Sequence, residues 1–284
     1  MYSTIINKTE KLADDLYMIT ETESIHCFLI LGTEKAVLFD VGYGYENIIP
    51  IIKSITDLPV IVILSHGDPD HGLGSVHFKE VYIHELDYGK LLLNDNRQLK
   101  EMCLKYRYQK MPIMKDIISM EDFCNKNLEH TKVKFLRNQA KIDIGDKILE
   151  VLHIPGHSYG SIALFDQKEK RLFTGDMVTY HNIWYFSAAD EQAPFYMAVK
   201  SYRKIKALEN DINWIYSAHG EVPVPKTIID ELLECFEREL CENYLNDIVF
   251  KSFAGNGYQH LYKHVNLIYS DERLSEYLNK KIRR

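Results

Sequence analysis

The stretch SHGDPDHG, residues 65–72, decides how the rest of the chain is interpreted. It follows the β-branched run 59–64, which is typical of a strand buried on both faces. Loops at strand ends commonly present functional side chains. Four side chains of this stretch can bind metal: His66, Asp68, Asp70 and His71. They exceed what one tetrahedral ion with an open position needs, so they favour two ions about 3.5–4 Å apart. The alternative is a polar turn in which these side chains cap the backbone.

Further ligand candidates lie downstream, again directly after predicted strands. Each has a glycine beside it, which would let the backbone turn sharply and carry the side chain over the end of the sheet. The candidates are His157 after the strand at 147–153, Asp176 after the strand at 171–174, and His219 after the strand at 214–217.

Taken in order, these motifs resemble those of the metallo-β-lactamase-fold hydrolases. The family pattern is His-x-His-x-Asp-His, then a histidine in a P-G-H loop, an aspartate in a T-G-D loop and a histidine after a late strand. The segments CFLI (27–30) and VLFDVG (37–42) also resemble the opening of that family. The resemblance covers residues 12 to about 225, interrupted at 86–130. It implies an α/β (α+β) fold, a four-layer αββα sandwich of two mixed β-sheets flanked by helices.

The resemblance also implies a ligand set for two divalent metal ions per chain, with zinc as the leading candidate. His66 and His157 would bind the first ion, and Asp176 would bridge both. Asp70, His71 and His219 would bind the second ion, and Asp70 and Asp176 would also act in catalysis. The family has a histidine where this chain has Asp68. A carboxylate there makes iron or manganese more acceptable and adds negative charge to the first site.

This ligand set predicts a binuclear metal-dependent hydrolase. A hydroxide held between the two ions would attack an ester, thioester, lactone or phosphodiester. The alternative is a di-iron oxidoreductase related to flavodiiron proteins, which also carry a carboxylate at this position, acting with a separate flavoprotein. A binding protein that kept the fold without turnover is a third reading, and the nearly complete ligand set argues against it.

The pattern of strands and helices predicts one domain over residues 1–284. It contains a helical insertion at about 86–130 and a C-terminal extension from about 245, both expected to cover the substrate pocket. Further strands are predicted at 16–20, 25–31, 36–40, 81–84, 133–136 and 161–165, with a strand pair around 258–269. Helices are predicted at 45–55, 194–208 and 228–246.

Composition limits the partners and the cellular location that we expect for this protein. The 284 residues carry a net charge of −7, which argues against non-specific binding to nucleic acid. The five cysteines include no C-x-x-C pair, as expected of free thiols in a reducing compartment. The first twenty residues predict no signal peptide, and the apolar runs are too short to cross a bilayer. We therefore expect a cytoplasmic protein with a small-molecule substrate and no nucleic-acid or membrane partner; a homodimer is left open.

Several side chains could line the site or simply pack in the core. Tyrosines or a histidine just after Asp176 could donate a hydrogen bond to a developing oxyanion. Tyrosine and methionine side chains of the insertion could line the pocket, although such stripes more often belong to a core. The residues concerned are Tyr180, His181 and Tyr185 in the first group, and Tyr106, Tyr108, Met111 and Met114 in the second.

The segment GHSYG, residues 156–160, matches the G-x-S-x-G elbow of serine hydrolases. That elbow needs a helix after the serine, and the segment 161–165 is β-like instead. We therefore expect that Ser158→Ala keeps most of the hydrolytic activity. A loss beyond about 10³-fold in kcat, with the metal content unchanged, would favour a serine nucleophile instead.

Overall fold

The computed structural model describes residues 3–22, 24–185, 193–252 and 255–282. The chain forms two compact units, Met1–Leu149 and Glu150–Arg284. Within the described ranges, no helix is both long and apolar enough to cross a membrane. The expectation of a single domain stays a prediction.

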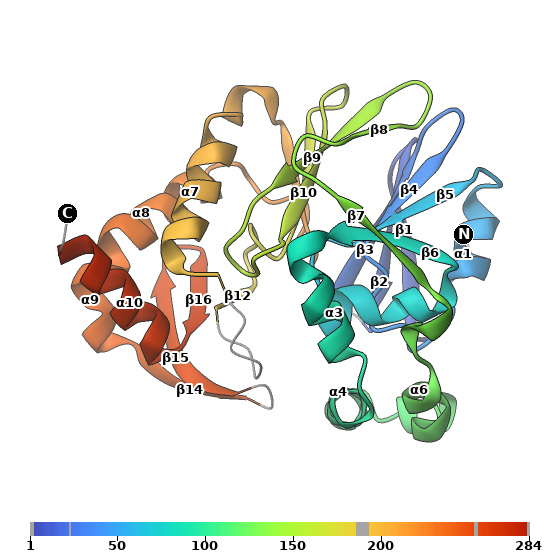
Figure 1. Cartoon of the computed structure of the whole chain (residues 1–284), viewed down its shortest axis with the longest axis horizontal. Coiled ribbons are helices and arrows are strands. Elements are labelled where there is room, and N and C mark those ends of the chain that lie inside the picture. Colours follow the sequence, from blue (N-terminus) through green and yellow to red (C-terminus); the bar gives the residue numbers. More distant parts are fainter. Residues whose placement is uncertain (1–2, 23, 186–192, 253–254, 283–284) are drawn as a thin grey trace. The chain divides into compact units, whose positions relative to one another are not determined.

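Unit 1, coloured from blue to green in Figure 1, is built on a seven-stranded mixed sheet. Its strands lie side by side in the order of the sequence. Its strands are β1 (Asn7–Ala13), β2 (Leu16–Glu21), β3 (Ile25–Leu31), β4 (Ala36–Phe39), β5 (Val60–Ile63), β6 (Glu80–His84) and β7 (Lys132–Leu136). The strands from β1 to β4 pair antiparallel, whereas those from β4 to β7 pair parallel. Because β4 and β5 are parallel, the residues that follow them meet at the same edge of the sheet.

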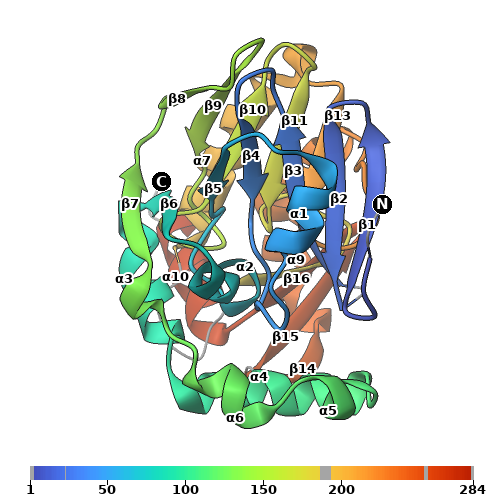
Figure 2. The same ribbon diagram turned by 90° about the vertical axis from the view of Figure 1, so that its right-hand side faces the viewer.

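Helix α1 (Ile49–Ile55) lies against this sheet and buries Ile51 and Ile52 (Figure 2). It begins four residues later than the helix predicted at 45–55. Residues 45–48 instead continue the loop that contains Gly42 and Gly44, both with positive φ. Buried Glu21 holds that loop, because its carboxylate accepts hydrogen bonds from the N–H groups of Tyr43 (2.7 Å) and Tyr45 (3.0 Å).

The predicted insertion is helical, with α3 (Tyr88–Asn94), α4 (Arg97–Lys110), α5 (Met114–Ile117) and α6 (Met120–Asn125). Helices α4, α5 and α6 gather at one end of the unit 1 sheet (Figure 2). Met114 is fully buried in a cluster with Tyr43 and Tyr45, and Met111 packs against it. The Tyr108 hydroxyl donates to the Ile118 carbonyl. Met114 is therefore a core residue, not a pocket-lining one, because its helix packs on the end of the sheet.

Two further mixed sheets follow. One has the order β13-β11-β10-β9-β8 and the other the order β12-β16-β15-β14. Their strands are β8 (Lys141–Asp143), β9 (Ile148–His153), β10 (Ile162–Asp166), β11 (Arg171–Gly175), β12 (Asn182–Tyr185), β13 (Trp214–Ser217), β14 (Ile248–Ser252), β15 (Gly255–Tyr262) and β16 (Val265–Tyr269). The C-terminal extension thus contributes strands of a third sheet, beyond the two that were expected.

The helices of unit 2 (Figure 1) share a core rich in aromatic rings with strands of both sheets. They are α7 (Phe195–Lys206), α8 (Ile228–Glu234), α9 (Leu240–Asn243) and α10 (Asp271–Ile282). The single helix predicted at 228–246 is interrupted by a π-helical turn, Cys235–Glu239. Phe236 of that turn is fully buried and contacts the rings of Phe195 and Tyr202. Apolar spacing alone does not reveal such a turn, because the apolar face continues through it.

Burial raises the pKa of the Glu21 carboxyl to about 7, against the opposite effect of the Tyr43 and Tyr45 N–H groups. The folded state therefore favours the protonated form. Its stabilising contribution is full below the ordinary pKa of 4.5 and is lost as the pH rises to about 7. We expect the stability of the metal-free wild type, relative to Glu21→Gln, to fall by up to about 3 kcal/mol across this window. Denaturant unfolding at a series of pH values measures it, and a constant difference would contradict the prediction.

Candidate functional site

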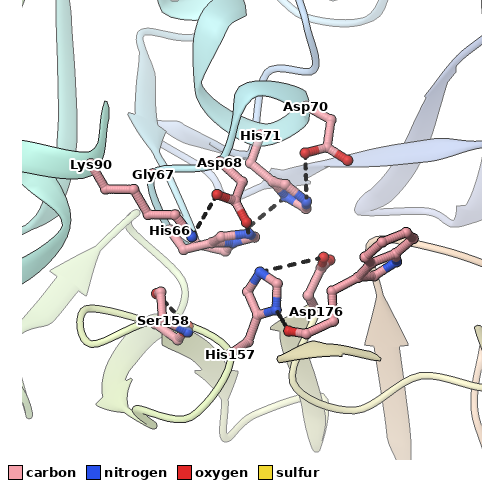
Figure 3. Close-up of polar contacts among 12 residues, drawn as sticks. His66, Gly67, Asp68, Asp70, His71, Lys90, His157, Ser158 and Asp176 are labelled. Carbon is pink, nitrogen blue, oxygen red and sulfur yellow. Dashed lines mark hydrogen bonds and ion pairs between the residues drawn. The ribbon is translucent and has the colours of Figure 1, made fainter. Parts of the chain in front are cut away.

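The four ligand candidates of unit 1 lie together where β5 ends (Figure 3). His66 and His71 are buried, whereas Asp68 and Asp70 are partly exposed. Asp68 immediately precedes the short helix α2 (Pro69–Gly72), whose first residue is a proline. Proline suits that position because its ring presets the helical φ and its missing N–H leaves no bond unmade.

Asp40, directly after β4, holds this loop in place through hydrogen bonds. Its side chain is buried and its φ is +67°, in the left-handed region. Its Oδ1 accepts the Ser65 N–H at 2.7 Å, and its Oδ2 lies 2.8 Å from Ser65 Oγ and 2.9 Å from His71 Nδ1. Sequence reasoning did not single out Asp40, although it lies within the VLFDVG segment. The signal was an acidic residue at the end of an otherwise apolar strand.

These contacts fix the proton on both histidine rings. A carboxylate only accepts hydrogen bonds, so both the Ser65 hydroxyl and His71 Nδ1–H donate to Asp40. The Ser65 oxygen then accepts from His66 Nδ1, at 2.8 Å. Each imidazole therefore carries its lone pair on Nε2. This is the outer-shell arrangement that orients histidine ligands of metal ions.

The Nε2 atoms of unit 1 face carboxylates at the separation expected of shared ligands. His66 Nε2 lies 3.3 Å from Asp68 Oδ2, and His71 Nε2 lies 3.7 Å from Asp70 Oδ1. Two donors, each about 2.1 Å from a tetrahedral ion, are about 3.4 Å apart. Both pairs are therefore spaced to bind one ion each.

The three ligand candidates of unit 2 show the same pattern. His157 Nδ1 donates to the Trp184 carbonyl of β12 at 2.6 Å, which leaves Nε2 as the donor to a metal. The two Asp176 oxygens face different histidines, with Oδ2 3.9 Å from His157 Nε2 and Oδ1 3.4 Å from His219 Nε2. A carboxylate placed in this way can bridge two ions.

Strand pairing explains why Asp176 and His219 come together. Strands β11 and β13 are parallel neighbours, so their carboxyl ends present both residues at one edge. The His219 carbonyl accepts hydrogen bonds from Thr179 Oγ1 at 2.8 Å and Ser217 Oγ at 2.7 Å. These bonds fix the backbone that carries the imidazole.

The remaining candidates have other surroundings. The buried Tyr185 hydroxyl is hydrogen-bonded to the Tyr202 hydroxyl at 2.7 Å, so this tyrosine belongs to the core. Tyr180 stacks on His264, with ring centres 4.8 Å apart. The His181 ring lies 5.5 Å from that of His219. These contacts favour packing for both tyrosines and leave His181 beside a ligand candidate.

The serine-elbow alternative lacks its helix. Ser158 Oγ lies 2.7 Å from Ser161 Oγ, and the chain then enters strand β10. This matches the β-like pattern expected there.

Comparisons with known proteins show the family of this chain. The sequence model of the metallo-beta-lactamase superfamily matches residues 21–219. The chain belongs to this superfamily. Among solved structures, a metallo-beta-lactamase from Pontibacter korlensis is similar with a TM-score of 0.58, at 16% identity, over 82% of this chain and 99% of that one. The metallo-β-lactamase fold predicted from the motifs is therefore confirmed.

Two proteins of known name are similar to this chain over part of their length. Acyl-coenzyme A thioesterase MBLAC2 of Gallus gallus is 28% identical over 53% of this chain and 56% of its own. The Homo sapiens protein of the same name is 26% identical over 60% of this chain and 65% of its own. The chain thus matches less than two thirds of the length of these superfamily relatives.

If Asp40 orients His71 for metal binding, Asp40→Asn should weaken that binding. The amide cannot accept both from the Ser65 groups and from His71, so the ring loses its fixed tautomer. We expect metal affinity about 10–100-fold lower, measured by competition with a chromogenic chelator. Asp166→Asn is the matched control, because Asp166 is also buried and accepts the Glu169 N–H in unit 2. Equal affinities in wild type and Asp40→Asn would contradict the role.

Proposed function

We propose that this protein is a metal-dependent hydrolase of thioesters. The observation that supports it most is the common orientation of three histidines. Each has Nδ1 bound to a protein oxygen, so that Nε2 is the donor presented to an ion. The proposed ligands of two divalent ions are His66, Asp68, Asp70, His71, His157, Asp176 and His219.

The donor set fits such ions. Four imidazole nitrogens suit zinc, and three carboxylates also accept iron or manganese. When bound, divalent ions would supply an acidic water molecule and polarise the substrate carbonyl. Zinc remains the leading candidate because imidazole outnumbers every other donor type in the set.

The protein side chains would orient the attacking water and accept its proton. In thioester hydrolysis, the water oxygen adds to the carbonyl carbon, the C–S bond breaks, and the thiolate leaves. Asp70 is partly exposed, with its side chain 23% accessible, so it can reach a substrate water. We assign it the orientation of that water and the acceptance of its proton. Asp176, whose oxygens face two histidines, would hold the ligand set together.

The thioester class rests on the relatives. Both carry the name acyl-coenzyme A thioesterase, at 26–28% identity. A thioester carbonyl is more electrophilic than an ester carbonyl, and its thiolate leaves without prior protonation. A site that supplies an activated water therefore suits such a substrate. Cytoplasmic location and the homodimer stay predictions.

The experiment is a substrate panel assayed with and without metal. Acyl-CoA thioesters of several chain lengths are compared with an aryl ester, a lactone and a phosphodiester. We expect thioester hydrolysis to be fastest, to vanish after dialysis against a strong chelator, and to return with zinc, manganese or iron(II). Hydrolysis by protein verified to be free of metal would refute the proposal. Faster turnover of the lactone or phosphodiester would refute the thioester class alone.

The carboxylate at position 68 favours a second candidate, a di-iron oxidoreductase. Anaerobically purified, iron-loaded protein is mixed with NADH and an added flavoprotein reductase. Oxygen-dependent NADH oxidation above that of the reductase alone, without thioester hydrolysis, would favour this candidate.

A further inference from the structure

One face of helix α3 is fastened to the metal-binding loop of unit 1. Asp87 precedes the helix, and Lys90 and Asn94 follow at positions that share a helical face. Asp87 Oδ2 accepts the Gly67 N–H at 2.9 Å, and Asn94 Nδ2 donates to the Gly67 carbonyl at 2.8 Å. Both polar groups of Gly67 are therefore held by the first helix of the insertion.

The approach of α3 to this loop leaves no space for a side chain. A Cβ on Gly67 would lie 2.7 Å from the Asp87 carbonyl oxygen and 2.8 Å from the Leu91 nitrogen. Both contacts are with backbone, which cannot move aside as a flexible side chain could. The residue between His66 and Asp68 therefore has to be glycine while α3 stays in place.

The third attachment is a buried ion pair. The Lys90 side chain is 5% exposed, and its Nζ lies 2.5 Å from Asp68 Oδ1. The other oxygen, Oδ2, lies 3.3 Å from His66 Nε2. Figure 3 shows Asp68 between Lys90 and His66. The two carboxylate oxygens thus have separate tasks, one toward the lysine and one toward the proposed metal ligand.

We propose that Lys90 is a positioning residue for the first metal ion. It binds one oxygen of Asp68 and so presents the other as a single donor beside His66. Its positive charge offsets the negative charge that Asp68 brings in place of the neutral histidine of related sites. The inference rests on the proposed metal site and adds a residue from the insertion to it.

The proposal has consequences for metal selectivity. A carboxylate that gives one oxygen suits the four-coordinate geometry of zinc. Without Lys90, Asp68 can offer both oxygens and its full charge, which favours ions of higher coordination number such as manganese. Lys90 would therefore preserve the preference of the first site for zinc, although Asp68 is a harder ligand than histidine.

The test is a set of variants at both positions with metal binding as the readout. Zinc and manganese affinities are measured by chelator competition for wild type, Lys90→Met, Lys90→Gln, Asp68→Asn and the double variant Asp68→Asn/Lys90→Met. We expect both Lys90 variants to bind zinc about 10–100-fold more weakly, with a smaller loss for manganese. Asp68→Asn should lose more zinc affinity than the double variant, because it leaves the lysine cation facing the ion without its carboxylate.

The matched control is Lys100→Met. Lys100, on α4, is another buried lysine of the insertion, and it pairs with Asp95 at the end of α3 instead of with the metal loop. It should lower the thermal stability of the metal-free protein without changing either affinity. Should Lys90→Met fail to fold, Lys90→Gln and the comparison of Asp68→Asn with the double variant still decide the question.

The outcomes separate the two proposals. A wild type that binds no divalent ion would refute the proposed function as a whole. A wild type that binds zinc, with Lys90 variants of unchanged zinc and manganese affinity, would overturn the role of Lys90 alone. Additive losses in the double variant would also overturn it, because independent residues do not couple.

Discussion

The buried carboxylate of Asp40 is the interaction on which the unit 1 site depends. It accepts from the Ser65 backbone, the Ser65 hydroxyl and His71 Nδ1. A buried charge is tolerated only when such hydrogen bonds satisfy it, so the loop after β5 must keep this conformation. The bonds that stabilise the carboxylate also set the tautomers of both histidines. The conformation of the loop and the orientation of both histidines therefore depend on one side chain.

The inserted helices have a second role beside packing on the end of the sheet. Helix α3 binds both polar groups of Gly67, and its Lys90 pairs with Asp68. A ligand loop held both by Asp40 and by α3 is preorganised, which lowers the entropy lost when an ion binds. Asp68 departs from the family pattern, and its partner Lys90 comes from the insertion, which also lies outside that pattern.

Local patterns predicted the strands of unit 1 well. The segment 25–31 was expected as a strand and forms β3 with those bounds, because its apolar run ends at a glycine. Predictions failed where distant residues override local preference. Glu21 binds the loop before α1, so that the helix begins later, and Phe236 enters the aromatic core through a π-helical turn.

Strand β12 was not predicted, yet its Trp184 carbonyl orients His157. Met114 and Tyr185 are core residues because their neighbours in space, not in sequence, are apolar.

By itself the sequence indicated the family and the candidate ligands that follow strands, because metal-ligand chemistry and strand patterns are properties of short segments. Only the tertiary structure decided which imidazole nitrogen is hydrogen-bonded to the protein and which groups hold the candidate ligands. Asp40 lies 31 residues from His71, and Lys90 lies 22 residues from Asp68. Their contacts exist because β4 and β5 pair in parallel and because α3 packs against Gly67. Neither parallel pairing nor helix docking has a signal within the motif itself.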